Sequence, residues 1–135
     1  MGAAVTQILK LDLPIRTEST LNKREPWQAL HRRKRAQLDA IALALRPLGV
    51  PRLPVVVTLT RIGPRLLDGD NLQGALKTVR DGIATWLGHD DAHPGIDWRY
   101  KQEIGATTML RLFTRSGRMT RAAEMRIRVD IERRG

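Results

Sequence analysis

The chain has 135 residues, with 24 Lys and Arg against 14 Asp and Glu, which gives a formal net charge of +10 at pH 7. This length suits one domain with a single hydrophobic core, and we expect one domain over residues 1–135. The absence of Cys excludes disulfides and thiolate metal sites. No apolar run approaches the roughly 20 residues that span a bilayer, and no signal-peptide pattern opens the chain, so we expect a cytoplasmic protein without a membrane partner. The positive charge favours a polyanionic partner, above all nucleic acid.

The first half of the chain predicts a strand, a helix and a second strand. Residues 6–15 alternate apolar and polar side chains, which is typical of a strand, and the polar residues that follow predict a loop. Apolar residues then recur at helical intervals until Pro47, at Trp27, Leu30, Leu38, Ile41 and Leu45. Residues 52–63 are rich in β-branched side chains and predict a strand.

The second half predicts a further helix and at least two strands. Apolar residues from Leu72 to Leu87 step by three and four, and Gly88 suits the end of that helix. Residues 96–104 and 124–132 alternate and predict strands. Between them, residues 108–115 predict another strand and residues 116–119 a turn. This order favours an α+β fold, with a small mixed or antiparallel sheet packed against two main helices.

Carboxylates gather in the stretch "LDGDNLQGALKTVRDGIATWLGHDDAH", residues 67–93, at Asp68, Asp70, Asp81, Asp90 and Asp91. One interpretation is structural: Asp70 caps the helix, with Gln73 three residues later as in a capping box, and Asp90 and Asp91 are turn residues. The other is chemical. If Asp68, Asp70 and Asp91 converge, a hard divalent cation such as Mg²⁺ would offset their repulsion, which is roughly 3 kcal/mol for two carboxylates about 5 Å apart. Such an ion activates water against a phosphodiester.

The order of these residues is similar to that of a known family. The segments "DGDN" at 68–71, "LKTVRDGI" at 76–83 and "DD" at 90–91 resemble the RusA-type crossover junction endodeoxyribonucleases, the Holliday junction resolvases common in bacteria and their prophages. The resemblance covers residues 6–104 and the final strand, and the coarse order of elements and the chain length also agree with that small fold. We therefore expect a RusA-like nuclease domain.

The resemblance implies an activity and a set of site residues. It implies a homodimer that binds four-way junctions or other branched DNA and makes paired symmetrical nicks, in DNA recombination and repair, with Mg²⁺ as cofactor or Mn²⁺ in its place. The implied catalytic metal ligands are Asp68, Asp70 and Asp91, with Asp90 as a neighbouring ligand.

The family also uses a lysine in this helix, and the resemblance implies Lys77 in that role. In the family pattern the lysine follows the second Asp by about one turn, where Gly74 stands in this chain. Lys77 falls on the same helical face as Asp70, about 10 Å further along. We expect Lys77 either to contact a substrate phosphate or to form an exposed ion pair with Asp81.

Clustered cations are the expected contacts to DNA. The predicted first helix carries a basic turn, and the preceding loop carries two more cations; together these are Arg32, Arg33, Lys34, Arg35, Lys23 and Arg24. Arg suits phosphate oxygens, although a solvated surface is the alternative interpretation of this turn. His89 and His93 have the spacing of a helical zinc site, but the Pro-Gly pair that follows argues against a helix there. The alternative function is a non-catalytic basic module that binds duplex or junction DNA.

Overall fold

The computed structural model describes residues 6–17, 26–105, 107–111 and 119–134. In chain order its elements are β1 (Thr6–Leu13), α1 (Trp27–Leu45), β2 (Val55–Gly63), α2 (Gly69–Leu87), β3 (Ile96–Ile104), β4 (Thr107–Arg111), β5 (Met119–Ala123) and β6 (Arg126–Arg133). One sheet has four strands in the order β1-β6-β2-β3, and β4 pairs with β5 in a second, two-stranded sheet. Because β3 runs parallel to β2 while the other pairs are antiparallel, the main sheet is mixed. The predicted α+β fold with two helices is confirmed.

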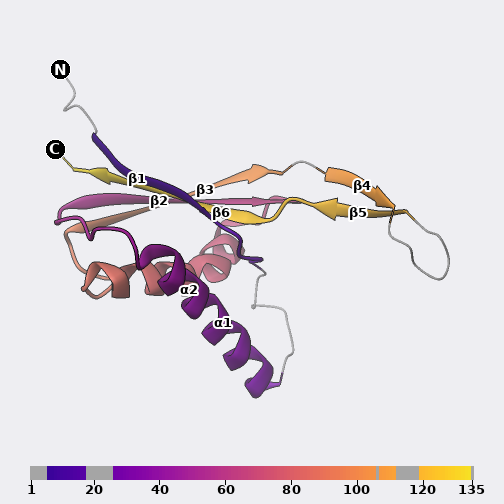
Figure 1. The fold of residues 1–135 in the computed structure, drawn as a ribbon, viewed down its shortest axis with the longest axis horizontal. Coiled ribbons are helices and arrows are strands. Elements are labelled where there is room, and N and C mark those ends of the chain that lie inside the picture. Colours follow the sequence, from indigo (N-terminus) through magenta and orange to yellow (C-terminus); the bar gives the residue numbers. More distant parts are fainter. Residues whose placement is uncertain (1–5, 18–25, 106, 112–118, 135) are drawn as a thin grey trace.

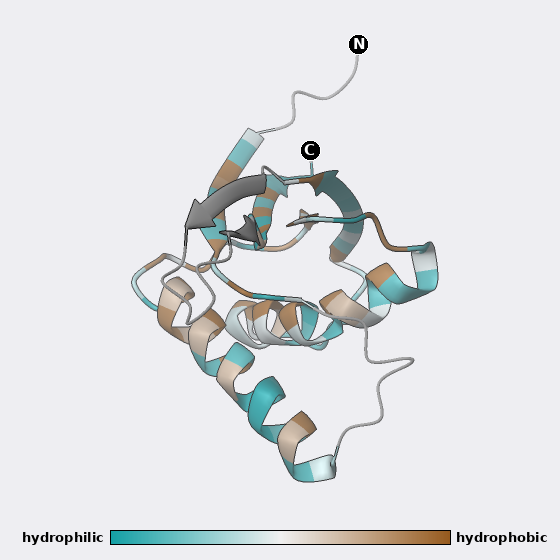
Figure 2. Cartoon of the chain, turned by 90° about the vertical axis from the view of Figure 1, so that its right-hand side faces the viewer, coloured by the Kyte–Doolittle hydropathy of each residue, from teal (hydrophilic) through white to brown (hydrophobic). Residues whose placement is uncertain are grey.

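Both helices pack against the same face of the four-stranded sheet (Figure 1). Hydrophobic and hydrophilic residues alternate along the strands (Figure 2), and on β6 Ile127, Val129 and Ile131 are fully buried. On its other face β6 carries charged side chains, and Arg126 Nη1 lies 2.7 Å from Asp12 Oδ2 on β1. This one-sided burial explains the alternation that the sequence shows.

α1 packs against the body of the molecule by its C-terminal end. Its buried side chains are Ile41 and Leu45, whereas Trp27 is 68% exposed and Leu38 is 36% exposed. The N-terminal end of α1 projects away from the sheet, as Figures 1 and 2 both show. The helix predicted from this apolar stripe is present, but the stripe is buried only at its C-terminal end, because the helix is longer than the surface that it covers. Neither α1 nor α2 is long and apolar enough to cross a membrane.

Two further boundaries differ from the sequence prediction. α2 begins at Gly69, before its first apolar residue Leu72, because the polar residues of its first turn leave no mark on a hydrophobic pattern. β5, which the sequence pattern misses, begins at Met119, the last residue of the predicted turn, and pairs antiparallel with β4; the rest of that turn, residues 116–118, lies outside the described residues. The strand predicted over residues 108–115 is described as far as Arg111, and the rest of it lies outside the described residues.

Gly82 permits the close approach of the two helices. A Cβ atom built at this position would lie 3.0 Å from Ile41 Cδ1 and 3.1 Å from Ile41 Cγ2. We expect Gly82→Val to lower the free energy of unfolding by about 1–3 kcal/mol through overpacking. Urea unfolding measures this, with Gly69→Val as the control, because a Cβ at Gly69 meets nothing within 4 Å. Equal losses in the two variants would contradict the role of Gly82.

Candidate functional site

Asp68 caps α2. It precedes the helix with an extended backbone, and its Oδ1 accepts a hydrogen bond of 2.9 Å from the backbone N–H of Asn71. Asp70 lies inside the first turn, where its negative charge suits the positive end of the helix dipole. The interpretation of Asp70 as the cap is therefore wrong. Capping accounts for Asp68 and leaves the carboxylate of Asp70 available for another role.

The segment that leads into α2 is fixed to the edge of the sheet. Gln102 on β3 donates to the carbonyl oxygen of Leu67 over 2.7 Å and accepts from the N–H of Leu67 over 2.8 Å. Arg61 on β2 is 4% exposed and donates to the carbonyl oxygen of Arg65 over 2.7 Å. These contacts hold the backbone at Arg65 and Leu67, shortly before Asp68. The acidic start of α2 therefore has a defined place beside β3.

Asp91 is held from two sides. Its backbone oxygen accepts hydrogen bonds from Trp98 Nε1 over 2.8 Å and from an Nη atom of Arg80 over 3.2 Å. Its carboxylate Oδ2 lies 3.0 Å from Arg80 Nε, an ion pair without hydrogen-bond geometry. Arg80 also donates to the hydroxyl of Tyr100 over 2.7 Å and lies over the Trp98 ring, 5.1 Å from its centroid. One guanidinium thus connects α2, β3 and the loop that carries Asp91.

Sequence reasoning missed Arg80, Trp98 and Tyr100 as parts of this site. Their contacts depend on β3 lying next to β2 in parallel register, with Leu59 opposite Tyr100. Such a pairing joins distant segments and leaves no local pattern. The available signal was weak: Ile96, Trp98 and Tyr100 are spaced two residues apart and so share one face of a predicted strand.

Lys77 and Asp91 line one hollow between α2 and β3. It has a volume of about 300 Å³, and its lining residues are Gln73, Gly74, Lys77, Arg80, Asp91 and Tyr100. Two of the predicted catalytic residues, from separate segments, are therefore brought together. Asp70 lies one helical turn before Gly74 on the same face of α2, but it is not among the residues that line this hollow.

The structure does not gather all the predicted metal ligands. Asp68 precedes α2 and Asp70 lies in its first turn, whereas Asp91 pairs with Arg80, which lies ten residues after Asp70 on this helix. Within the described ranges there is no group of three or more His, Cys, Asp or Glu side chains that could hold a metal ion. Mg²⁺ requires only one or two carboxylates when water and substrate phosphates supply its other ligands. The oxygen donors of Asp68 and Asp70 fit Mg²⁺ in kind.

Asp90 has the geometry of a turn residue. Its Oδ1 accepts a hydrogen bond of 2.9 Å from the backbone N–H of Ala92. This bond, followed by a hydrogen bond with the side chain of Asp91, lowers the pKa of Asp90. The carboxylate of Asp90 is therefore an anion stabilised locally within its own loop.

Asp81 lies on α2 and interacts electrostatically with Asp91 and with the neighbouring cations. Burial, followed by the negative charge of Asp91, raises the pKa of Asp81, while the positive charges of Lys77, Arg80 and Lys34 act in the opposite direction. The part of the chain that the structure describes contains no salt bridge between Lys77 and Asp81. The exposed ion pair expected as the alternative role of Lys77 is therefore absent there, and the two groups interact at longer range.

The raised pKa of Asp81 predicts a pH dependence of stability. The folded state binds this proton more tightly than the unfolded state, so the stabilisation is fully present below the unfolded pKa and is lost as pH rises through the folded pKa. We expect Asp81→Asn to remove this contribution. Urea unfolding of the parent and the variant between about pH 4 and pH 7 measures it, and a difference between the two proteins that stays constant across this range would contradict the prediction.

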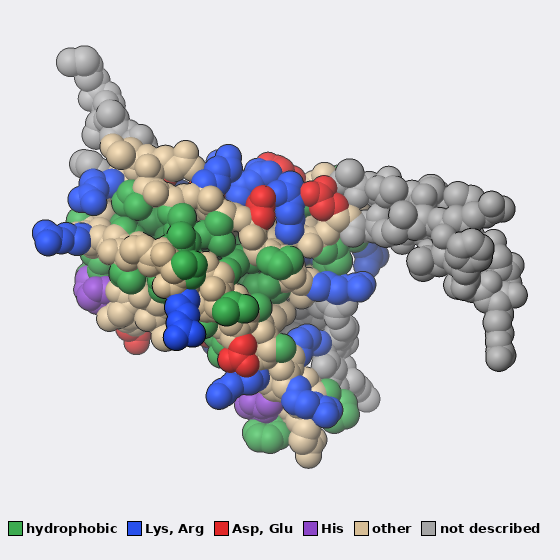
Figure 3. Space-filling view, viewed as in Figure 1, with side chains coloured by type: hydrophobic (Ala, Val, Ile, Leu, Met, Phe, Trp, Pro, Cys, Tyr) green, Lys and Arg blue, Asp and Glu red, His purple; other side chains and the backbone are tan. Residues whose placement is uncertain are grey.

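The expected DNA contacts on α1 are in part exposed. Arg32, Lys34 and Arg35 are exposed, and Arg33 is half-buried. Arg35 lies 3.8 Å from Asp39 in an exposed i,i+4 pair. Figure 3 shows several Lys and Arg side chains around the projecting end of α1. The other two predicted contacts, Lys23 and Arg24, lie outside the described residues.

Comparison with known proteins adds no assignment to this geometry. No family model matches the chain, and no curated protein matches it. The resemblance to the resolvases therefore stays a prediction.

Proposed function

We propose that the chain is a Mg²⁺-dependent endodeoxyribonuclease that cuts branched DNA, above all four-way junctions, in recombination and repair. The observation that carries this proposal is the hollow that Lys77 and Asp91 share beside α2. The first turn of the same helix carries Asp70, directly after Asp68 and Gly69. A net charge of +10 supports DNA as the partner, since it attracts a polyanion.

The residues of the chain have separate roles in this proposal. Asp68 and Asp70 would hold Mg²⁺ or Mn²⁺, and a bound ion of this kind lowers the pKa of water and offsets charge on phosphate oxygens. Lys77 places an ammonium group beside the hollow, where it would attract a phosphate. Arg80 fixes the loop of Asp91, so that its carboxylate keeps one position in the hollow that Lys77 also lines.

A homodimer is the assembly that suits this activity. A two-fold axis would set two copies of the site against the two strands to be cut, so that the nicks are paired and symmetrical. The cations of α1, together with Lys23 and Arg24, would then bind the backbones of the arms. Because these contacts are electrostatic, we expect affinity for DNA to fall strongly as salt rises.

One observation favours a second candidate, a non-catalytic module that binds duplex or junction DNA. The carboxylate of Asp68 caps α2, and the carboxylate of Asp91 pairs with Arg80. Both side chains therefore have structural partners that account for them without a metal ion. In this case the cations alone would give the protein its function.

The two candidates differ in one experiment. The protein is incubated with a labelled synthetic four-way junction, and with a linear duplex of matching sequence, in Mg²⁺ or in EDTA. The nuclease proposal expects the junction to be cut in Mg²⁺ and not in EDTA. Junction binding without any nick in Mg²⁺ would contradict the nuclease and support the binding module.

A further inference from the structure

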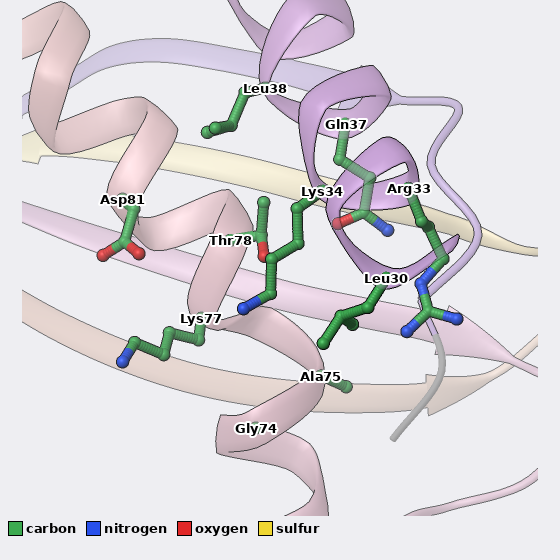
Figure 4. Close-up of a pocket in the computed structure, with 10 residues that line it drawn as sticks. All are labelled: Leu30, Arg33, Lys34, Gln37, Leu38, Gly74, Ala75, Lys77, Thr78 and Asp81. Atoms are coloured by element: carbon green, nitrogen blue, oxygen red, sulfur yellow. The ribbon is translucent and has the colours of Figure 1, made fainter. Parts of the chain in front are cut away.

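A second hollow lies between α1 and α2. Its volume is about 270 Å³, and apolar side chains from both helices, Leu30, Leu38 and Ala75, form part of its wall. Figure 4 shows the side chain of Lys34 extending from α1 toward the part of α2 that carries Lys77 and Thr78. Both lysines and Thr78 line this hollow. It is therefore a cavity with ammonium and hydroxyl donors on a partly apolar wall.

Among the residues that the structure describes, the two lysines have no close partner. Neither Lys34 nor Lys77 makes a salt bridge or a hydrogen bond with any residue that the structure describes. The carboxylate in the lining is that of Asp81, which both lysines influence electrostatically. Each ammonium group offers three hydrogen-bond donors, and the hydroxyl of Thr78 offers one. Arg33 also lines the hollow, so three positive charges stand against one negative charge, and this set of donors suits an oxyanion.

The hollow between the helices is adjacent to the hollow beside Asp91. Gly74 and Lys77 line both of them. Gly74 has no side chain, so no side chain rises between the two hollows at this point of α2. A chain of linked phosphates that crosses α2 at Gly74 would contact Lys34 on one side and the region of Asp91 on the other. A nucleic acid strand has this form, whereas a single free anion would occupy one hollow.

We infer that the hollow between α1 and α2 binds a phosphodiester group of a DNA strand, with Lys34 and Lys77 as charge partners and Thr78 as a hydrogen-bond donor. This inference rests on the proposed function, because it places one strand of the substrate relative to the site. It goes beyond that proposal in assigning Thr78 and in making one phosphate site from two helices.

The test is DNA binding in EDTA, where no cutting interferes. Binding of a labelled four-way junction is measured by fluorescence anisotropy over a series of salt concentrations. Lys34→Gln should weaken binding by roughly three- to tenfold and reduce the slope of log affinity against log salt by about one. Thr78→Val should weaken binding by about threefold without a change in slope, because it removes a neutral donor. Lys101→Gln, an exposed residue of β3, is the control and should leave both quantities unchanged.

Two results would overturn the inference. One is a Lys34→Gln variant with the affinity and the salt slope of the parent protein. The other is a shift of the Thr78 amide resonance with inorganic phosphate but none with DNA, which would mean a site for a free anion. The outcome is separate from that of the nuclease test. If the parent protein binds the junction without cutting it in Mg²⁺ and Lys34→Gln still lowers the slope, the phosphate site stands while the nuclease proposal fails.

Discussion

Asp70→Asn should reduce Mg²⁺-dependent cutting of a four-way junction by about 100-fold or more, which corresponds to about 3 kcal/mol of transition-state stabilisation. The substitution keeps the shape of the side chain and removes the charge that would bind the metal ion. It should leave the fold intact, because Asp68 and not Asp70 caps α2. Junction binding in EDTA should also stay at the level of the parent protein. Cutting rates with saturating enzyme, together with the thermal midpoint of the variant, measure these expectations.

Two matched variants make this prediction specific. Asp39→Asn changes an exposed carboxylate on α1 that pairs with Arg35, and it should cut at the parent rate. Asp68→Asn should lose cutting but keep helix stability, since Asn caps a helix as well as Asp does, whereas Asp68→Ala should also cost about 1 kcal/mol of stability. If Asp70→Asn cuts as fast as Asp39→Asn, Asp70 does not belong to the site.

Arg80→Met should lower the free energy of unfolding by about 2 kcal/mol. The variant loses the hydrogen bond to the Tyr100 hydroxyl, the contacts with Asp91 and the position over the Trp98 ring. It also leaves the partly buried carboxylate of Asp91 without its cation, and removing one partner of such a pair costs more than the pair contributes. Cutting should fall as well, because the loop of Asp91 is no longer fixed to α2.

The control for Arg80 is an arginine on the edge strand β3. Arg99 lies 3.2 Å from Asp97, and its side chain is 62% exposed. Because exposed pairs contribute about 0–1 kcal/mol, Arg99→Met should be nearly neutral. Urea unfolding of the two variants gives the comparison. Equal stability of Arg80→Met and Arg99→Met would show that Arg80 does not hold the site together.

Hydrophobic periodicity located the parts of the fold that are buried over their whole length. The body of α2 follows the prediction, because its apolar residues repeat with the period of a helix and face one core. β2 follows the prediction made from its β-branched residues, because it is buried on both faces. The hydrophobic pattern failed where an apolar stripe continues past the buried part of a helix, and where a helical turn contains no apolar residue. Trp27 continues the apolar stripe of α1 but lies beyond the sheet, and the polar first turn of α2 contains nothing that such a pattern detects.

The sequence pointed to some residues of the candidate site but not to their contacts. The motif drew attention to Lys77 and Asp91, which line one hollow, and to Asp70, which helical spacing places on the same face of α2 as Gly74. The partners of Asp91 depend on the parallel pairing of β2 with β3, which no local sequence pattern encodes. For this reason Arg80 and Tyr100, although central to the geometry, were found through the structure.

The central claim is that this protein cuts both strands of branched DNA with a divalent metal ion. The most direct measurement uses a supercoiled plasmid that extrudes a cruciform, since paired nicks across the junction give a linear molecule and a single nick gives an open circle. In Mg²⁺ the proposed homodimer should produce linear plasmid, and in EDTA it should bind without cutting. Plasmid that stays supercoiled in Mg²⁺ while the protein is bound to it would contradict the claim.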